Sequence, residues 1–364
     1  MEGVLDFLYN IPVLGYVIQF IAYLISVIPD IAPIVLGLAA PIALGALCGV
    51  MNERSGVVNI GIEGMMLISA FTGFMVALVV DNAIGGEPSE GAFAASPALL
   101  IGLLAAMLAG ALVSVLHAWL SISIRADQII SGTIINILAL GLTGYLNRLI
   151  SPTGGAGTFR SFDPPEWLVD IPVVGWIFNM FLNQGPIAMS VIVFVVVLQI
   201  LLFRSRWGLR TRAVGEHPRA ADTVGIDVMR VRYRNVIVGG VFAGLAGGYL
   251  TLEATGSFQN GMTAGRGFIA LAAVIFGRWT PIGAFLGSLL FMGSQALGVA
   301  IRSNPPVGAL GETLAGFQQA YPSIYNNFFA ALPYVLTIII LAGVVGRSIP
   351  PASVGVPYEK EGRA

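Results

Sequence analysis

Apolar runs long enough to cross a lipid bilayer recur along the whole chain, and they constrain its fold more than any other feature. A bilayer core of roughly 30 Å is crossed by about twenty residues of α-helix. Of the 364 residues, 56% are hydrophobic, only 10% are charged and 46 are glycine. Such a chain is too apolar and too rich in glycine for an ordinary soluble domain. The sequence therefore predicts an all-α polytopic membrane protein.

About ten stretches have the composition of a membrane span. They lie near residues 12–29, 31–51, 57–80, 97–124, 128–146, 186–204, 235–253, 266–278, 281–302 and 329–346. The stretch at 266–278 is too short for a full crossing, and the turn Arg278-Trp279-Thr280-Pro281 closes it. We expect a half-helix or a re-entrant segment there. Three parts are predicted: an N-terminal part at 1–30, a transmembrane domain at 31–346 and a tail at 347–364.

A basic segment at 204–234 separates two of these spans. It holds eight of the eighteen basic residues, namely Arg204, Arg206, Arg210, Arg212, Arg219, Arg230, Arg232 and Arg234. Lys and Arg in short loops resist translocation, so we expect this segment to face the cytoplasm. With about ten spans, both termini are then cytoplasmic, and the segments 81–96 and 147–185 face outward.

The same segment contains the signals of one short helix. Pro218 and the glycines Gly215 and Gly225 bracket the helix-capable run RAADTV. Proline favours a helix start and glycine a helix end. The loop is therefore expected to present a small helix to a soluble partner.

The sequence shows no motif for catalysis or metal binding. It has no P-loop, and its one lysine is Lys360, so the chain does not hydrolyse nucleotides by the P-loop route. His117 and His217 stand alone, without a metal-ligand cluster or a nucleophile and base pair. His117 is interpreted as a packing residue, and Cys48, the one cysteine, as a small buried hydrophobe. A non-catalytic transport protein without a cofactor is expected.

Three kinds of transport protein fit these features: a secondary carrier, the membrane subunit of an ATP-driven complex, and a passive pore. A secondary carrier uses ionisable residues at membrane depth, and Glu63 and Glu253 come close to such positions. The membrane subunit of an ATP-driven complex needs an element that docks on a cytosolic ATPase. The basic loop supplies such an element, and this favours the ATP-driven complex.

Four stretches, at 39–71, 125–141, 208–233 and 266–291, closely resemble one permease subunit of bacterial nucleoside ABC importers. These belong to a larger family that carries ribose, other simple sugars and branched-chain amino acids. The resemblance runs from about residue 31 to the C-terminus, and the string EHPRAADTVGI is its most specific part. It implies import and a coupling helix near 216–226. The residues that would contact the ATPase are Glu216, His217, Arg219, Ala221, Asp222 and Gly225.

The resemblance also implies partners. They are a cytosolic subunit that binds ATP and Mg, a second homologous permease subunit, and a substrate-binding lipoprotein outside the cell. The complex would lie in the lipid of the bacterial cytoplasmic membrane, and no nucleic acid partner is implied.

Uncharged polar residues at membrane depth are candidates for the solute path. They are Asn59, Gln128, Thr133, Asn136 and Gln295, together with Tyr249, Phe258 and Gln259 beside a glycine-rich break. Amides, hydroxyls and rings suit a neutral, ring-bearing solute such as a nucleoside. The same groups could instead join helices by hydrogen bonds. Simple sugars such as ribose and riboflavin-like compounds remain open as alternative solutes.

Overall fold

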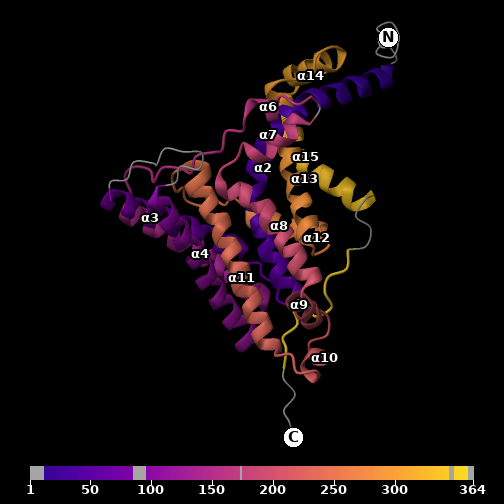
Figure 1. Ribbon diagram of the computed structural model, residues 1–364. Coiled ribbons are helices and arrows are strands. Elements are labelled where there is room, and N and C mark those ends of the chain that lie inside the picture. The colour runs from indigo at the N-terminus through magenta and orange to yellow at the C-terminus, as the bar shows by residue number, and fades with distance from the viewer. Residues whose placement is uncertain (1–11, 85–95, 173, 344–347, 360–364) are drawn as a thin grey trace. The chain divides into compact units, whose positions relative to one another are not determined.

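The computed structural model describes residues 12–84, 96–172, 174–343 and 348–359 (Figure 1). Over these residues the secondary structure is helical, and no strand occurs in them. The α-helices are α2 (Pro12–Arg54), α3 (Ile62–Ile84), α4 (Pro97–Ala118), α5 (Gln128–Ile150), α6 (Glu166–Val169), α7 (Gly175–Leu182), α8 (Pro186–Arg204), α9 (Arg206–Glu216), α10 (Pro218–Thr223), α11 (Val228–Tyr249), α12 (Arg266–Phe276), α13 (Pro281–Ser303), α14 (Ala309–Ala320) and α15 (Pro322–Gly343). Two π-helical turns, η1 (Trp119–Ser123) and η2 (Leu250–Thr255), extend α4 and α11.

Seven helical segments within the described residues are long and apolar enough to cross a membrane. They are Gly15–Arg54, Ile62–Ile84, Pro97–Ser123, Gln128–Ile150, Pro186–Arg204, Val228–Thr255 and Pro281–Ser303. The predicted spans at 12–29 and 31–51 form one continuous helix, because Pro29 and Asp30 between them do not end α2. The predicted short segment is α12, with 11 residues. The predicted span at 329–346 coincides with α15 as far as Gly343, and its last three residues lie outside the described residues. A count of ten and the orientation of the termini stay predictions.

The chain divides into two compact units. The smaller comprises Met1–Leu36, Pro164–Asn183 and Leu289–Gly346, and the larger comprises Gly37–Asp163, Gln184–Ser288 and Arg347–Ala364. In the smaller unit, a buried cluster contains Tyr23, Val27, Ala300, Ile301, Tyr325 and Phe329. The basic loop and seven of the eight predicted solute-path residues belong to the larger unit.

Glycine brings α3, α4 and α11 of the larger unit into close contact (Figure 1). A Cβ atom built on Gly110 of α4 would lie 2.3 Å from the carbonyl oxygen of Gly240 in α11. One built on Gly247 would lie 2.2 Å from the carbonyl oxygen of Met66 in α3. These helices therefore approach backbone to backbone, which only small residues permit.

Candidate functional site

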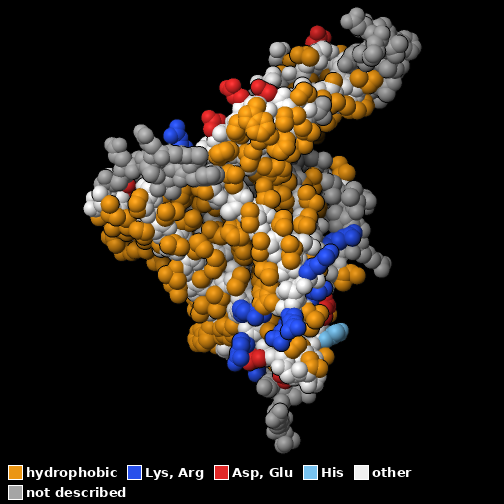
Figure 2. Space-filling view, viewed as in Figure 1, with side chains coloured by type: hydrophobic (Ala, Val, Ile, Leu, Met, Phe, Trp, Pro, Cys, Tyr) orange, Lys and Arg blue, Asp and Glu red, His pale blue; other side chains and the backbone are white. Residues whose placement is uncertain are grey.

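The basic segment folds into α9 and α10, around which arginine side chains gather (Figure 2). Ser205 caps α9, since its hydroxyl accepts a hydrogen bond from the N–H of Gly208 at 3.1 Å. Pro218 begins α10, where its missing N–H costs nothing. Gly225 lies just beyond α10 with φ +83°, a conformation that glycine adopts without strain. The short helix expected in this loop is present.

The six residues implied as ATPase contacts differ in their exposure. His217, Arg219 and Gly225 are exposed, and Asp222 is half-buried. Ala221 is buried, in a cluster with Val214, Val228, Val231 and Tyr358. Glu216 is half-buried, and its carboxylate accepts a hydrogen bond from the N–H of Ala352 at 3.1 Å. The first four can meet a partner directly, whereas Ala221 and Glu216 hold the loop in place. Contact of all six with an ATPase stays a prediction.

The C-terminal segment binds along this loop, which nothing in the sequence indicated. The N–H of Ser353 donates to the carbonyl of Gly215 at 2.9 Å, and the Ser353 hydroxyl donates to the carbonyl of Glu216 at 3.0 Å. Residues predicted as a plain tail are therefore part of the loop's own structure. A run such as PASVGVPYE carries no helix or strand period, so its binding place could not be read from it.

Side chains at the end of α2 form hydrogen bonds with the turn that precedes α13. The Trp279 indole N–H donates to the carboxylate of Glu53, and both side chains are buried. The Arg54 guanidinium donates to the carbonyl oxygens of Trp279 at 2.7 Å and Arg278 at 3.1 Å. Both turn residues have left-handed backbone, with φ of 50° at Arg278 and 53° at Trp279. Non-glycine residues hold that conformation only where their surroundings enforce it. The turn predicted at 278–281 is thus present, and side chains of α2 hold it in place.

The basic loop packs directly against the end of α2. A Cβ atom on Gly215, near the end of α9, would lie 2.2 Å from the carbonyl oxygen of Arg54. The guanidinium groups of Arg54 and Arg212 both lie over the ring of Phe203, at 5.5 and 5.1 Å from its centroid. The loop, the end of α2 and the turn before α13 therefore form one contiguous contact. We call the residues Glu53, Arg54, Arg278 and Trp279 the latch.

Three predicted solute-path residues surround the non-helical break at 55–61 and satisfy its buried backbone. Gln128 accepts a hydrogen bond from the N–H of Val58 at 2.7 Å. Asn136 donates to the carbonyl of Ile60 at 3.0 Å, and Asn59 accepts from the N–H of Gly61 at 3.0 Å. Backbone groups buried away from water need such partners. These amides therefore join the helices to the break.

His117 belongs to the same network. Its Nε2 lies 2.9 Å from the carbonyl oxygen of Val58, and its Nδ1 lies 3.1 Å from the hydroxyl of Ser131. The side chain is fully buried with both ring nitrogens engaged. Its prediction as a packing residue is confirmed.

The remaining predicted path residues do not join this network. The Tyr249 hydroxyl donates to the carbonyl of Gly37 at 2.6 Å. Thr133 is exposed and donates to the carbonyl of Ile129 in its own helix at 2.9 Å. Gln259 is exposed, and Gln295 is an exposed residue of the smaller unit.

Phe258 lines a cavity of about 370 Å³ in the larger unit. The lining residues are Phe74, Asn147, Ser151, Pro152, Gly154, Ser257 and Phe258. The Phe258 ring is held edge-on against that of Phe71, with centroids 5.1 Å apart. Two rings, one amide and two hydroxyls thus face one space, which is the mixture expected for the solute path. Asn147, Ser151 and Ser257 escaped the sequence analysis because they lie at helix ends and in loops.

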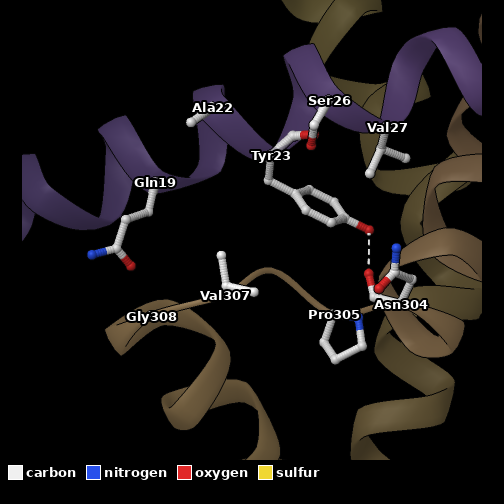
Figure 3. Close-up of a pocket in the computed structure, with 9 residues that line it drawn as sticks. All are labelled: Gln19, Ala22, Tyr23, Ser26, Val27, Asn304, Pro305, Val307 and Gly308. Atoms are coloured by element: carbon white, nitrogen blue, oxygen red, sulfur yellow. Dashed lines mark hydrogen bonds between the residues drawn. The ribbon is translucent and has the colours of Figure 1, made fainter.

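A second hollow lies in the smaller unit (Figure 3). It has a volume of about 430 Å³ and runs between α2 and the segment 304–308. Tyr23 crosses it and donates to the carbonyl of Asn304 at 2.8 Å. None of the predicted solute-path residues lines it.

Glu63 and Glu253 each bind the start of another helix. The Glu253 carboxylate accepts from the N–H groups of Ile187 and Ala188 at 2.7 and 3.0 Å, where α8 begins. The Glu63 carboxylate accepts from those of Gly265 and Gly267 at 2.7 and 2.6 Å, where α12 begins. Carboxylates are stabilised at helix N-termini by the unpaired N–H groups and by the helix dipole. Both acids therefore have structural bonds, and this weakens the interpretation as an ion-coupled carrier.

Comparison with known proteins supports the same class. The model of the family "branched-chain amino acid transport system / permease component" matches residues 31–341. The chain is 43% identical over 343 residues to the guanosine ABC transporter permease protein NupQ of Bacillus subtilis, a match that covers 93% of this chain and 98% of NupQ. It is 36% identical over 326 residues to the nucleoside ABC transporter permease protein NupC of Lactococcus lactis, covering 88% and 94%. It is 33% identical over 319 residues to the putative glucose ABC transporter permease protein TsgC13 of Haloferax volcanii, covering 85% and 90%.

The relatives of the two bacteria come in pairs. Each bacterium has a second, less similar permease for guanosine or nucleosides, at 27% and 24% identity to this chain. No solved structure gives a significant match. The resemblance inferred from the sequence is confirmed over nearly the whole chain. The chain belongs to the family of branched-chain amino acid transport system permease components, and it is an integral membrane subunit of a transport system.

Proposed function

We propose that this chain is the permease subunit of an ABC importer that moves nucleosides into the cell. One observation carries the proposal, namely 43% identity to a guanosine permease over 93% of this chain. The second relative is named for nucleosides, whereas the third is named for glucose. A simple sugar is therefore the alternative solute.

The proposed complex has four kinds of subunit. A separate cytosolic subunit hydrolyses ATP, and it docks on the basic loop at 204–234. A second permease completes the membrane part, as the pairing of the relatives suggests. A binding lipoprotein delivers the solute from outside. This arrangement needs the loop and both termini on the cytoplasmic side, in line with the positive-inside rule.

The contacts of the loop suggest how docking reaches the membrane helices. A push on α10 passes to α9 through the cluster of Val214, Ala221 and Val228. It then passes from Gly215 to the end of α2 and through the latch to the start of α13. Closely packed backbone transmits displacement because it cannot be compressed. The latch is thus the proposed mechanical link between the motor and the membrane.

The cavity at Phe258 is the proposed place of the solute on this chain. Phe74 and Phe258 offer aromatic contacts to a planar base, and Asn147, Ser151 and Ser257 offer hydrogen bonds to base or sugar. Its volume of about 370 Å³ is within the range of small-molecule sites.

The function is tested by uptake into membrane vesicles that contain the whole complex. Labelled guanosine is expected to accumulate only with ATP inside the vesicles, and accumulation should persist when proton and sodium gradients are collapsed. Vesicles without this chain are the control. Accumulation driven by an ion gradient without ATP would contradict the proposal, and uptake of glucose but not guanosine would shift it to the sugar.

The solute cavity is tested by Phe258→Leu. Loss of one aromatic contact costs about 1 kcal/mol, so we expect the KM for guanosine uptake to rise about fivefold. Phe268→Leu is the matched control, because Phe268 is 49% exposed and does not line the cavity. An unchanged KM in the Phe258 variant would place the solute elsewhere.

A further inference from the structure

Residues 351–359 form a bound segment that we call the C-terminal strap. Besides its bonds to Gly215 and Glu216, the strap reaches three other parts of the chain. The N–H of Gly355 donates to the carbonyl of Gly56 at 3.3 Å, and the carbonyl of Val356 accepts from the Arg232 guanidinium at 3.0 Å. Arg125 pairs with Glu359 at 2.7 Å. The strap therefore ties the basic loop to the break after α2, to α11 and to the connection before α5.

Burial adds to these bonds. Tyr358 is 6% exposed and packs in the cluster with Ala221 of α10 and Val228 of α11. Arg232 is 1% exposed beneath the strap, and two of its guanidinium nitrogens have no hydrogen-bond partner. Burying a charge with few partners is costly, so the strap's other contacts must offset that cost. We therefore regard the strap as a structural part of the loop.

A groove of about 610 Å³ runs between α10 and the strap. Pro218 and Ala220 line one wall, and Val356 and Pro357 line the other, with His217 and Ser353 among the polar lining residues. Val356 is 54% exposed although it is apolar. Apolar side chains on both walls thus lie beside polar and charged lining residues, which include Arg219 and Glu359. Protein–protein contacts combine apolar and polar groups in the same way.

We propose that the strap and α10 together form one docking surface, whose groove receives an apolar side chain of the ATP-binding subunit. The inference rests on the proposed function, and it adds a second element to the interface. The groove shares a wall with α10, which the proposed function assigns to the ATPase. Exposed Arg206, Arg210 and Arg230 on the same loop favour a partner with acidic residues around that apolar side chain.

The test labels one side chain of the groove in the whole complex. Val356→Cys is treated with a bulky maleimide, and the ATPase that co-purifies in detergent is measured. Ile349→Cys is the matched control, because Ile349 lies just before the strap, is 78% exposed and does not line the groove. The natural Cys48 is fully buried and is expected to stay unlabelled.

We expect labelled Val356→Cys to retain about fivefold less ATPase, as for loss of one interface residue worth about 1 kcal/mol, and labelled Ile349→Cys to match the wild type. Retention by the unlabelled variant is the reference from which the effect of the label is measured. Equal retention with and without the label would overturn the inference. So would a label that reduces binding to anionic vesicles while leaving ATPase retention unchanged, because the groove would then face lipid. A wild-type chain that retains no ATPase would overturn the proposed function itself.

Discussion

Trp279→Phe is expected to lower the free energy of unfolding by about 2 kcal/mol. The substitution removes the indole N–H that donates to Glu53 but keeps an aromatic ring in a site that is 5% exposed. The Glu53 carboxylate, in a side chain 8% exposed, then loses its donor and stays buried. An unpaired buried acceptor costs more than the bond contributed when it was made. Thermal unfolding of the purified chain in detergent measures the change.

Two further variants separate the hydrogen bond from the ring. Trp119→Phe is the control for the same change of size, because Trp119 is 50% exposed, and it should unfold as the wild type does. Glu53→Leu combined with Trp279→Phe removes both polar partners, so we expect it to be more stable than Trp279→Phe alone. If the double variant were less stable than either single one, the latch would depend on packing rather than on this bond.

Local sequence signals predicted the fold class and several of the helices, but not the shorter helices α6, α7, α9 and α14. Apolar runs, prolines and glycines gave the all-α class, the short helix α12 and the small helix of the basic loop, since each depends on residues close in the sequence. The continuity of α2 was missed because Pro29 and Asp30 resemble a break, whereas a long apolar helix continues through them.

The contacts between distant segments could not be predicted from the sequence. Glu53 and Trp279 are 226 residues apart, and Ser353 lies 137 residues from Glu216. No periodicity links such partners, and a single sequence gives no covariation. The same limit applies to the solute path. Gln128 and Asn136 were sensible candidates as polar residues among apolar ones, but only the fold shows that the buried break at 55–61 takes up their hydrogen bonds.

Gly215→Ala is expected to lower ATP-driven uptake about 30-fold, within the usual range of coupling free energies between sites. The new Cβ atom would lie 2.2 Å from the carbonyl oxygen of Arg54 and 2.9 Å from its carbonyl carbon. The new atom meets backbone rather than a flexible side chain that could move aside. We therefore expect α9 to move away from the end of α2. The exposed side chains of α10 are unchanged, and the ATPase should still co-purify. Gly144→Ala is the control, because a Cβ atom there meets nothing within 4 Å in its helix α5. Uptake at the wild-type rate by the Gly215→Ala variant would show that force does not pass through this contact, whereas loss of uptake with the ATPase still bound would place the transmission step between the loop and the latch.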